Sequence, residues 1–225
     1  MLAIDGVDVP TRPEAAKDRR PGRKKKRAKR ARWKGQLREA KGFRFYLVHG
    51  KRIVHLLSWH QVQSDEEPGD APRQVKQARL IPEERVRLCV VADGAKWIWK
   101  HAKALFPSAV QVLDHYHCCE RLHEVASAQF DSHPEQQTEW VEATIARLFC
   151  GEVSAVIVDL KHIKATHARA AEKIRKLTGY LTNNQERVSY GSARKGGYPL
   201  GSGGIESAHT SLAMSGSNAL VPGGT

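Results

Sequence analysis

The sequence predicts an α/β fold in which parallel strands are covered by helices. Residues 86–92 and 109–113 are short, continuous apolar runs, which are typical of buried strands, and a helical pattern over residues 95–106 separates them. Because parallel neighbours need a crossover of this kind, the order favours a parallel sheet with helices on its faces. A hairpin pattern before this unit and helical periodicity after it complete the prediction of a mixed sheet flanked by helices.

The hairpin is predicted over residues 43–59. Phe43, Phe45 and Leu47 alternate onto one face of its first strand, and a glycine at position 50 separates that strand from a second β-rich run. We expect the hairpin to lie antiparallel to a strand that contains Ile4. A helix is expected over residues 72–80.

The helices are predicted from apolar residues that recur three and four positions apart. Pro107 ends the helix at 95–106, and another helix starts near Tyr116. Residues 130–190 have a helical pattern throughout, with a last helix over residues 162–180, so we expect an all-helical insertion there. Its two clearest apolar stripes are Val141, Ile145, Leu148, Phe149 and Val153, Val156, Ile157, Leu160.

The predicted organisation has four parts. Residues 1–129 form the α/β core and include a basic loop over residues 10–42. Residues 130–190 form the helical insertion, and residues 191–209 hold a Gly-rich loop and the start of a further helix. Residues 210–225 have no periodicity.

The charge balance predicts a polyanionic partner, most simply nucleic acid. The chain has 37 lysines and arginines against 24 aspartates and glutamates, a net charge of +13. A basic run can neutralise several phosphates, although a solvated basic loop has the same composition. No apolar run approaches the ~18 residues of a transmembrane helix. The basic residues of the run are Arg23, Lys24, Lys25, Lys26, Arg27, Lys29, Arg30 and Arg32.

Three apolar runs each end in an aspartate, at Asp5, Asp93 and Asp114. Sites in open α/β sheets lie outside the carboxyl ends of the strands, and neighbouring strands are ~4.8 Å apart, so these carboxylates can converge. Converged carboxylates repel one another unless cations neutralise them, and two divalent cations there suit phosphoryl transfer. The alternative is that each aspartate is a turn residue or a helix cap.

Two other groups of polar residues give weaker signals. Glu206 follows the Gly-rich loop, where a glutamate in the first turn of a helix is also favoured by the helix dipole. The loop lacks the Lys-Ser/Thr pair of a phosphate-binding P-loop. The cluster of histidines and cysteines has no ligand pair at the spacing of structural zinc sites, so zinc is not favoured. The cluster consists of His115, His117, Cys118, Cys119 and His123.

Four sequence blocks resemble bacterial insertion-sequence transposases of the ISKra group, which are DDE enzymes. They are Ala-Ile-Asp-Gly-Val-Asp-Val-Pro at 3–10, Val-Val-Ala-Asp-Gly-Ala-Lys-Trp-Ile-Trp at 90–99, Gln-Val-Leu-Asp-His-Tyr-His at 111–117 and Gly-Tyr-Pro-Leu-Gly-Ser-Gly-Gly-Ile-Glu-Ser at 197–207. The resemblance covers residues 2–209, and the blocks are long, ordered and correctly spaced.

The resemblance implies an RNase H-like core with a DDE triad of Asp5, Asp93 and Glu206, with Asp8 as the alternative for the first position. It implies that the helical insertion precedes the final catalytic helix. Asp114 and His117 match the Asp/Cys-x-x-His signature of Mutator-like transposases, which makes them site-supporting residues.

The function that the resemblance implies is metal-dependent cleavage and transfer of DNA strands during transposition. The triad would hold Mg²⁺, for which Mn²⁺ substitutes. The expected partners are the terminal repeats of the element and target DNA, with homo-oligomers assembled on DNA and no membrane partner. The expected location is the bacterial cytoplasm, in association with the nucleoid.

The chain departs from the family pattern at both ends. Family members have DNA-binding elements before the first aspartate. The sequence that follows their glutamate motif differs from the one in this chain. A frameshift near residue 210 accounts for the second departure, so residues 210–225 are expected to be out of frame and the activity to be impaired. The alternatives are a non-catalytic basic nucleic-acid-binding protein and a cellular nuclease of the same fold.

Overall fold

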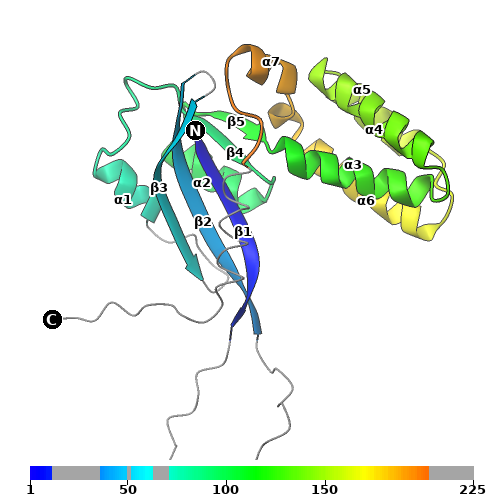
Figure 1. Ribbon diagram of the computed structural model, residues 1–225, viewed down its shortest axis with the longest axis horizontal. Helices are drawn as coiled ribbons and strands as arrows, with labels where there is room; N and C mark the ends of the chain where they lie inside the picture. Colours follow the sequence, from blue (N-terminus) through cyan, green and yellow to red (C-terminus); the bar gives the residue numbers. More distant parts are fainter. Residues whose placement is uncertain (12–35, 50–51, 63–70, 203–225) are drawn as a thin grey trace, which may run out of the picture.

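The structure is a computed structural model that describes residues 1–11, 36–49, 52–62 and 71–202. Its centre is a mixed five-stranded sheet with the strand order β3-β2-β1-β4-β5 (Figure 1). β1 pairs antiparallel with β2 and parallel with β4, while β3 is antiparallel to β2 and β5 is parallel to β4. The strands are β1 (Leu2–Thr11), β2 (Gln36–His49), β3 (Arg52–Val62), β4 (Cys89–Ala92) and β5 (Val110–Leu113). The predicted mixed sheet and its antiparallel hairpin are confirmed.

Seven α-helices and one 3₁₀-helix lie in the described part of the chain. α3 packs against α4 and α6, and α5 packs against α4 and α6, so that α3–α6 form a helical unit beside the sheet (Figure 1). The helices are α1 (Ala71–Gln77), α2 (Lys96–Leu105), α3 (His115–Gln129), α4 (Pro134–Phe149), α5 (Val153–His162), α6 (Ala168–Asn183), η1 (Gln185–Arg187) and α7 (Tyr190–Lys195). Among these described helices, none combines the length and the apolarity needed to span a membrane.

One hydrophobic core extends from the sheet and α2 into the helical unit, where it includes Leu122, Val141 and Leu181. All four residues of β4 are buried, because β1 and β5 flank the strand and helices cover it. Ile98 and Ala102 of α2 are buried in this core, as their helical spacing predicts. Phe43 of β2 stacks on Trp59 of β3 with ring centroids 5.7 Å apart, which confirms the pairing of the predicted hairpin.

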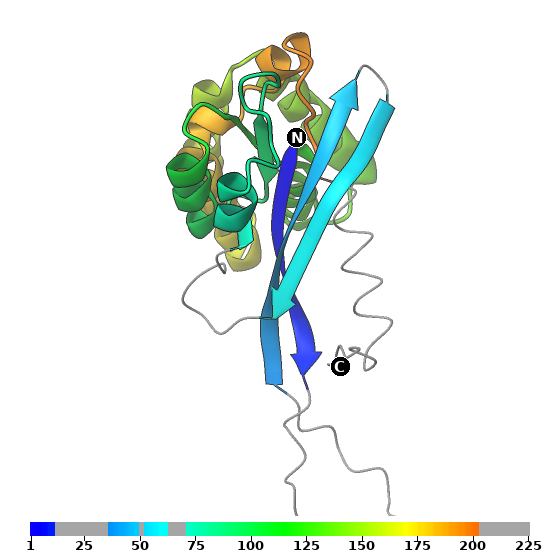
Figure 2. The same cartoon turned by 90° about the vertical axis from the view of Figure 1, so that its left-hand side faces the viewer.

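The expected loop over residues 10–42 is wrong at both of its ends. β1 continues to Thr11 and β2 begins at Gln36, so the two strands form an antiparallel ribbon that extends past the short β4 and β5 (Figure 2). Polar pairs such as Asp8 with Glu39 lie within this ribbon. Backbone hydrogen bonds extend the ladder without the apolar alternation by which a strand is recognised in sequence.

The burial of the predicted face of Phe43, Phe45 and Leu47 ends before its last member. Phe45 is buried, whereas Leu47 is 47% exposed. Leu2 pairs with Phe45, so Leu47 lies beyond the start of β1, where the sheet has only β2 and β3. An alternating pattern cannot show where a neighbouring strand stops.

Candidate active site

The pairing register aligns the three predicted aspartates. Ile4 pairs with Ala92, and Ala92 pairs with Leu113. Asp5, Asp93 and Asp114 are the next residues on these neighbouring strands. The structure therefore brings the three backbone positions together at the carboxyl end of the parallel strands.

Asp5 differs from the other two aspartates because its strand does not end there. β1 leaves its parallel partner β4 after Ile4 but continues along β2, where Asp5 pairs with Gly42. The prediction that all three aspartates end strands is wrong for Asp5. The antiparallel partner supplies backbone hydrogen bonds past this point, so Asp5 is held within a ladder and not in a turn.

Asp93 is half-buried at the end of β4. Within the described residues its carboxylate accepts a single hydrogen bond, from the backbone N–H of Ala95 at 2.9 Å to Oδ1. Its carbonyl oxygen accepts a hydrogen bond from the Tyr180 hydroxyl at 3.0 Å. Gly94 follows with φ of +96° and turns the chain into α2. Asp93 thus has a fixed backbone and a carboxylate with acceptor capacity to spare.

Asp114 is fully buried and caps α3. Its Oδ1 accepts from the backbone N–H of Tyr116 at 2.8 Å, and its Oδ2 accepts from the backbone N–H of Ser202 at 2.7 Å and from the Ser202 hydroxyl. The N–H of His115 donates to the carbonyl oxygen of Leu200 at 2.8 Å. The helix-cap alternative is therefore correct for Asp114. Its carboxylate also ties the Gly-rich loop to the end of the sheet.

His117 lies in the first turn of α3, close to Asp114 in the sequence. Its Nδ1 is 3.1 Å from Glu120 Oε2 on the same helix. The structure thus places His117 at the same end of α3 as the Asp114 cap.

Tyr180 and Ser202 contact the predicted aspartates but were missed in the sequence. Arg121 adds to this group, because its guanidinium lies over the Tyr180 ring at 4.3 Å from the centroid. Burial raises the pKa of Tyr180 far above its usual value, so the phenol retains the proton that it donates. Tyr180 is 87 residues from Asp93, and no local pattern links them. Ser202 lies within the block at 197–207 that resembles transposases, and this membership is the only feature of the sequence that points to it.

His115 is enclosed by aromatic rings. The ring centroids of Phe149 and Tyr190 lie 5.4 and 5.2 Å from that of His115, and Cys119 Sγ lies 3.5 Å from its Nε2. Burial lowers the pKa of His115, and the nearby Asp114 carboxylate partly opposes this shift.

We expect His115 to make the protein less stable as the pH falls. The imidazole has a pKa of 6.5 in the unfolded chain and a lower one in the folded chain. Below pH 6.5 the imidazole takes up a proton in the unfolded chain more readily than in the folded chain. The contribution of His115 to the free energy of unfolding is therefore fully present above the unfolded pKa and decreases as the pH falls below it. The variant His115→Phe retains a ring among the aromatic side chains. The melting temperature of the wild type relative to this variant should decrease between pH 7.5 and 5.5, and a difference independent of pH would contradict the assignment.

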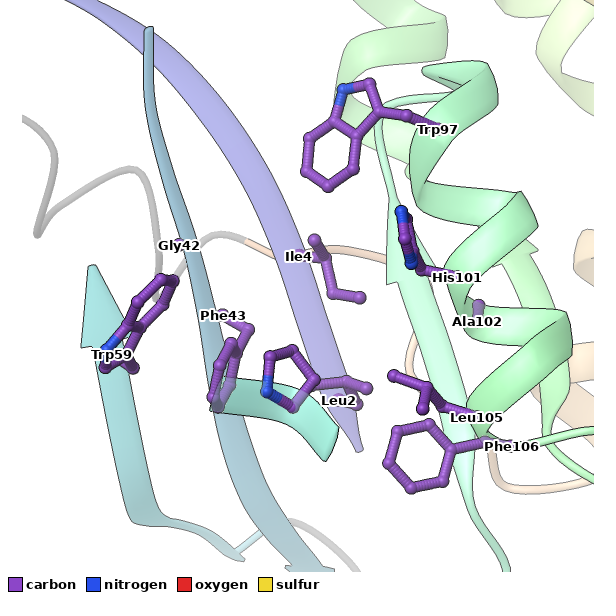
Figure 3. Close-up of a pocket in the computed structure, with 11 residues that line it drawn as sticks. Leu2, Ile4, Gly42, Phe43, Trp59, Trp97, His101, Ala102, Leu105 and Phe106 are labelled. Carbon is purple, nitrogen blue, oxygen red and sulfur yellow. The ribbon is translucent and has the colours of Figure 1, made fainter. Parts of the chain in front are cut away.

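A small apolar cavity lies between α2 and the sheet (Figure 3). Trp97, His101 and Leu105 line it from α2, and Leu2 and Ile4 line it from β1. Its volume is about 20 Å³, which leaves room for about one water molecule. The cavity is therefore a packing gap and not a substrate pocket.

A larger hollow of about 730 Å³ lies at the end of the sheet away from the three aspartates. Tyr46, Leu56, Leu80 and Tyr198 are among its lining residues, which include Cys89 at the amino end of β4. No carboxylate or imidazole side chain of the described residues lines it. Its size alone does not make it a catalytic site, and the predicted aspartates do not line it.

Several predicted residues lie outside the part of the chain that the structure describes. Glu206 and the whole basic run are among them, and for Asp5 and Asp8 only the backbone is described. The residues of the run are Arg23, Lys24, Lys25, Lys26, Arg27, Lys29, Arg30 and Arg32.

The available carboxylates decide how a divalent cation would fit. The side chains that the structure describes contain no group of three or more histidine, cysteine, aspartate or glutamate residues placed to hold a metal. Asp93 fits as a ligand, since its carboxylate has free acceptor capacity. Asp114 does not fit, because three donors already occupy its oxygens.

Comparisons of the chain with known protein families, curated proteins and solved structures found no match.

Proposed function

We propose that this chain is a DDE transposase of an insertion sequence, which cleaves and transfers DNA strands in a metal-dependent reaction. The observation that carries the proposal is the alignment of Asp5 and Asp93 on neighbouring strands. The Gly-rich loop that leads to Glu206 is tied beside them through Asp114. These residues belong to the blocks that resemble transposases of the ISKra group.

The topology supports an RNase H-like fold as part of this proposal. An antiparallel β1–β2–β3 unit continues into parallel β4 and β5, with helices between and after the parallel strands. In such a sheet the first strand is central and its neighbour β4 carries the second aspartate. Function does not follow from a fold alone, so the proposal depends on the aspartates.

Chain connectivity supports Glu206 as the third member of the triad. Ser202 is held against Asp114 by a backbone hydrogen bond of 2.7 Å. Glu206 is four residues further along the chain. A chain of four residues spans at most about 14 Å. The link therefore limits how far Glu206 can lie from Ser202, in agreement with its proposed role.

In the proposed mechanism, Asp93 supplies a fixed carboxylate, and Asp5 and Glu206 complete an oxygen-rich site. A divalent cation bound there would activate an oxygen nucleophile and stabilise the leaving oxygen at phosphorus. The protein's part is to orient these carboxylates and the DNA backbone. Asp114 orients the loop before Glu206, and the net charge of +13 favours DNA through its phosphates.

The proposal is tested with Asp93→Asn, which retains the shape of the side chain and removes its charge. The wild-type chain is expected to have impaired but measurable Mn²⁺- or Mg²⁺-dependent cleavage and joining of DNA from either side of the gene, and the variant should lower this activity more than about 100-fold. This loss exceeds what an outer-shell partner of a metal typically costs. Asp131→Asn is the matched control, because Asp131 is exposed between α3 and α4. Calorimetric titration with Mn²⁺ gives a second measurement, and its binding should also require Asp93.

A non-catalytic nucleic-acid-binding protein is the second candidate. The net charge of +13 favours it, because binding to phosphates does not require the aspartates. It predicts salt-sensitive DNA binding that Asp93→Asn leaves unchanged, with no cleavage by the wild type. Cleavage without joining, lost in Asp93→Asn, would favour a nuclease of the same fold. Either result would overturn the transposase proposal.

A further inference from the structure

The helical unit contacts the candidate active site through the end of α6. The Tyr180 hydroxyl donates to the carbonyl oxygen of Asp93 at 3.0 Å. Asn184, which follows α6, is fixed by a hydrogen bond of 3.0 Å from its Nδ2 to the Tyr180 carbonyl oxygen. This contact ties the turn after β4 to a segment almost ninety residues further along the chain.

Gly94 shows how closely α6 approaches this turn. A Cβ atom at position 94 would lie 2.9 Å from Tyr180 Cε2 and 3.0 Å from Asn184 Nδ2. Contacts this short leave no room for a side chain, so the backbone at Gly94 lies directly against the Tyr180 ring and Asn184. The position of Asp93 is therefore coupled to the position of α6.

Arg121 of α3 packs against the Tyr180 ring. Its guanidinium lies 4.3 Å from the ring centroid, within the range of a cation–π contact. α3 and α6 pack together along the helical unit. The Tyr180 ring is thus fixed between α3 and the turn that carries Asp93.

We propose that Tyr180 is a positioning residue for Asp93, which makes the helical unit part of the active site. The hydroxyl fixes the backbone of residue 93, and Arg121 holds the Tyr180 ring. This inference rests on the proposed function for the catalytic role of Asp93. The contact itself is a property of the fold and can be tested without any activity.

Tyr180→Phe is the informative variant, because it removes the hydroxyl but retains the ring against Gly94 and Arg121. We expect kcat for DNA cleavage to fall about tenfold, the effect of losing one hydrogen bond that fixes the reacting geometry. The KM for DNA should stay unchanged, since the hydroxyl that is removed donates to the Asp93 carbonyl oxygen. A merely structural role would instead lower the amount of folded enzyme and leave kcat per folded molecule unchanged.

Hydrogen exchange of the Ala95 amide, which donates to Asp93 Oδ1, gives the readout that does not depend on activity. In Tyr180→Phe this amide should exchange at least about tenfold faster than in the wild type. Tyr46→Phe is the matched control. Its hydroxyl accepts a hydrogen bond from Arg44 Nη1 at 3.4 Å, at the end of the sheet away from Asp93, and both measurements should match the wild type.

The outcomes separate the two proposals. Faster exchange in Tyr180→Phe, combined with a wild type that neither cleaves DNA nor binds Mn²⁺, would overturn the proposed function and the catalytic meaning of the contact. An active wild type with unchanged exchange and unchanged kcat in Tyr180→Phe would overturn the positioning role alone. Faster exchange together with a selective loss of kcat supports both.

Discussion

Replacing Asp114 with alanine is expected to destabilise the protein by about 3 kcal/mol or more. The substitution removes the cap of α3, which alone contributes about 1 kcal/mol. It also leaves the N–H and the hydroxyl of Ser202 without their acceptor in a buried site, at about 1–3 kcal/mol for each such group. The free energy of unfolding in urea measures the effect.

Two further variants make this experiment specific. Asp131→Ala removes an exposed carboxylate from the turn after α3 and should change the stability by less than about 0.5 kcal/mol. Ser202→Ala removes the hydroxyl donor but retains the backbone one, so its effect should be smaller than that of Asp114→Ala. A loss below about 1 kcal/mol for Asp114→Ala would show that the carboxylate does not tie the loop to the sheet.

Gly94→Val is expected to destabilise the protein by about 3 kcal/mol. Its φ of +96° lies in a region that β-branched residues rarely adopt. The new Cβ would also lie 2.9 Å from Leu113 Cδ1 and 2.9 Å from Tyr180 Cε2. Backbone strain and overpacking each cost about 1–3 kcal/mol. Urea unfolding provides the measurement.

Gly179→Ala is the matched control for the glycine substitution. Gly179 lies in α6 beside Tyr180, and nothing occupies the space where its Cβ would lie. Alanine should therefore stabilise the helix by up to about 1 kcal/mol. Opposite signs for these two glycines are the expected result, and a Gly94→Val protein as stable as the wild type would disprove the close approach of α6.

The parallel part of the fold could be predicted because its signals are local. The last four residues of the apolar run 86–92 form β4, and the apolar spacing of Ile98 and Ala102 identified the buried face of α2. Residues at the carboxyl ends of parallel neighbours must lie at one edge of a sheet. The alignment of Asp5, Asp93 and Asp114 therefore followed from their positions after apolar runs.

The remaining features depend on contacts that no local pattern encodes. Asp114 has the same place in the sequence pattern as Asp93, yet Ser202 occupies its carboxylate. Tyr180 looks like any aromatic residue on the partly buried face of a helix. The ribbon of β1 with β2 continues through polar residues, and its length is set by backbone pairing that hydrophobic periodicity does not report.

The central position of β1 has a consequence for folding during synthesis. Leu2 pairs with Phe45 on one side and with Val90 on the other, so the second partner follows the first by 45 residues. At roughly 5–20 residues per second, a ribosome takes a few seconds to make that stretch. Throughout this interval the nascent β1–β2–β3 unit presents the bare edge of β1, and a chaperone that binds exposed strand edges would meet it there.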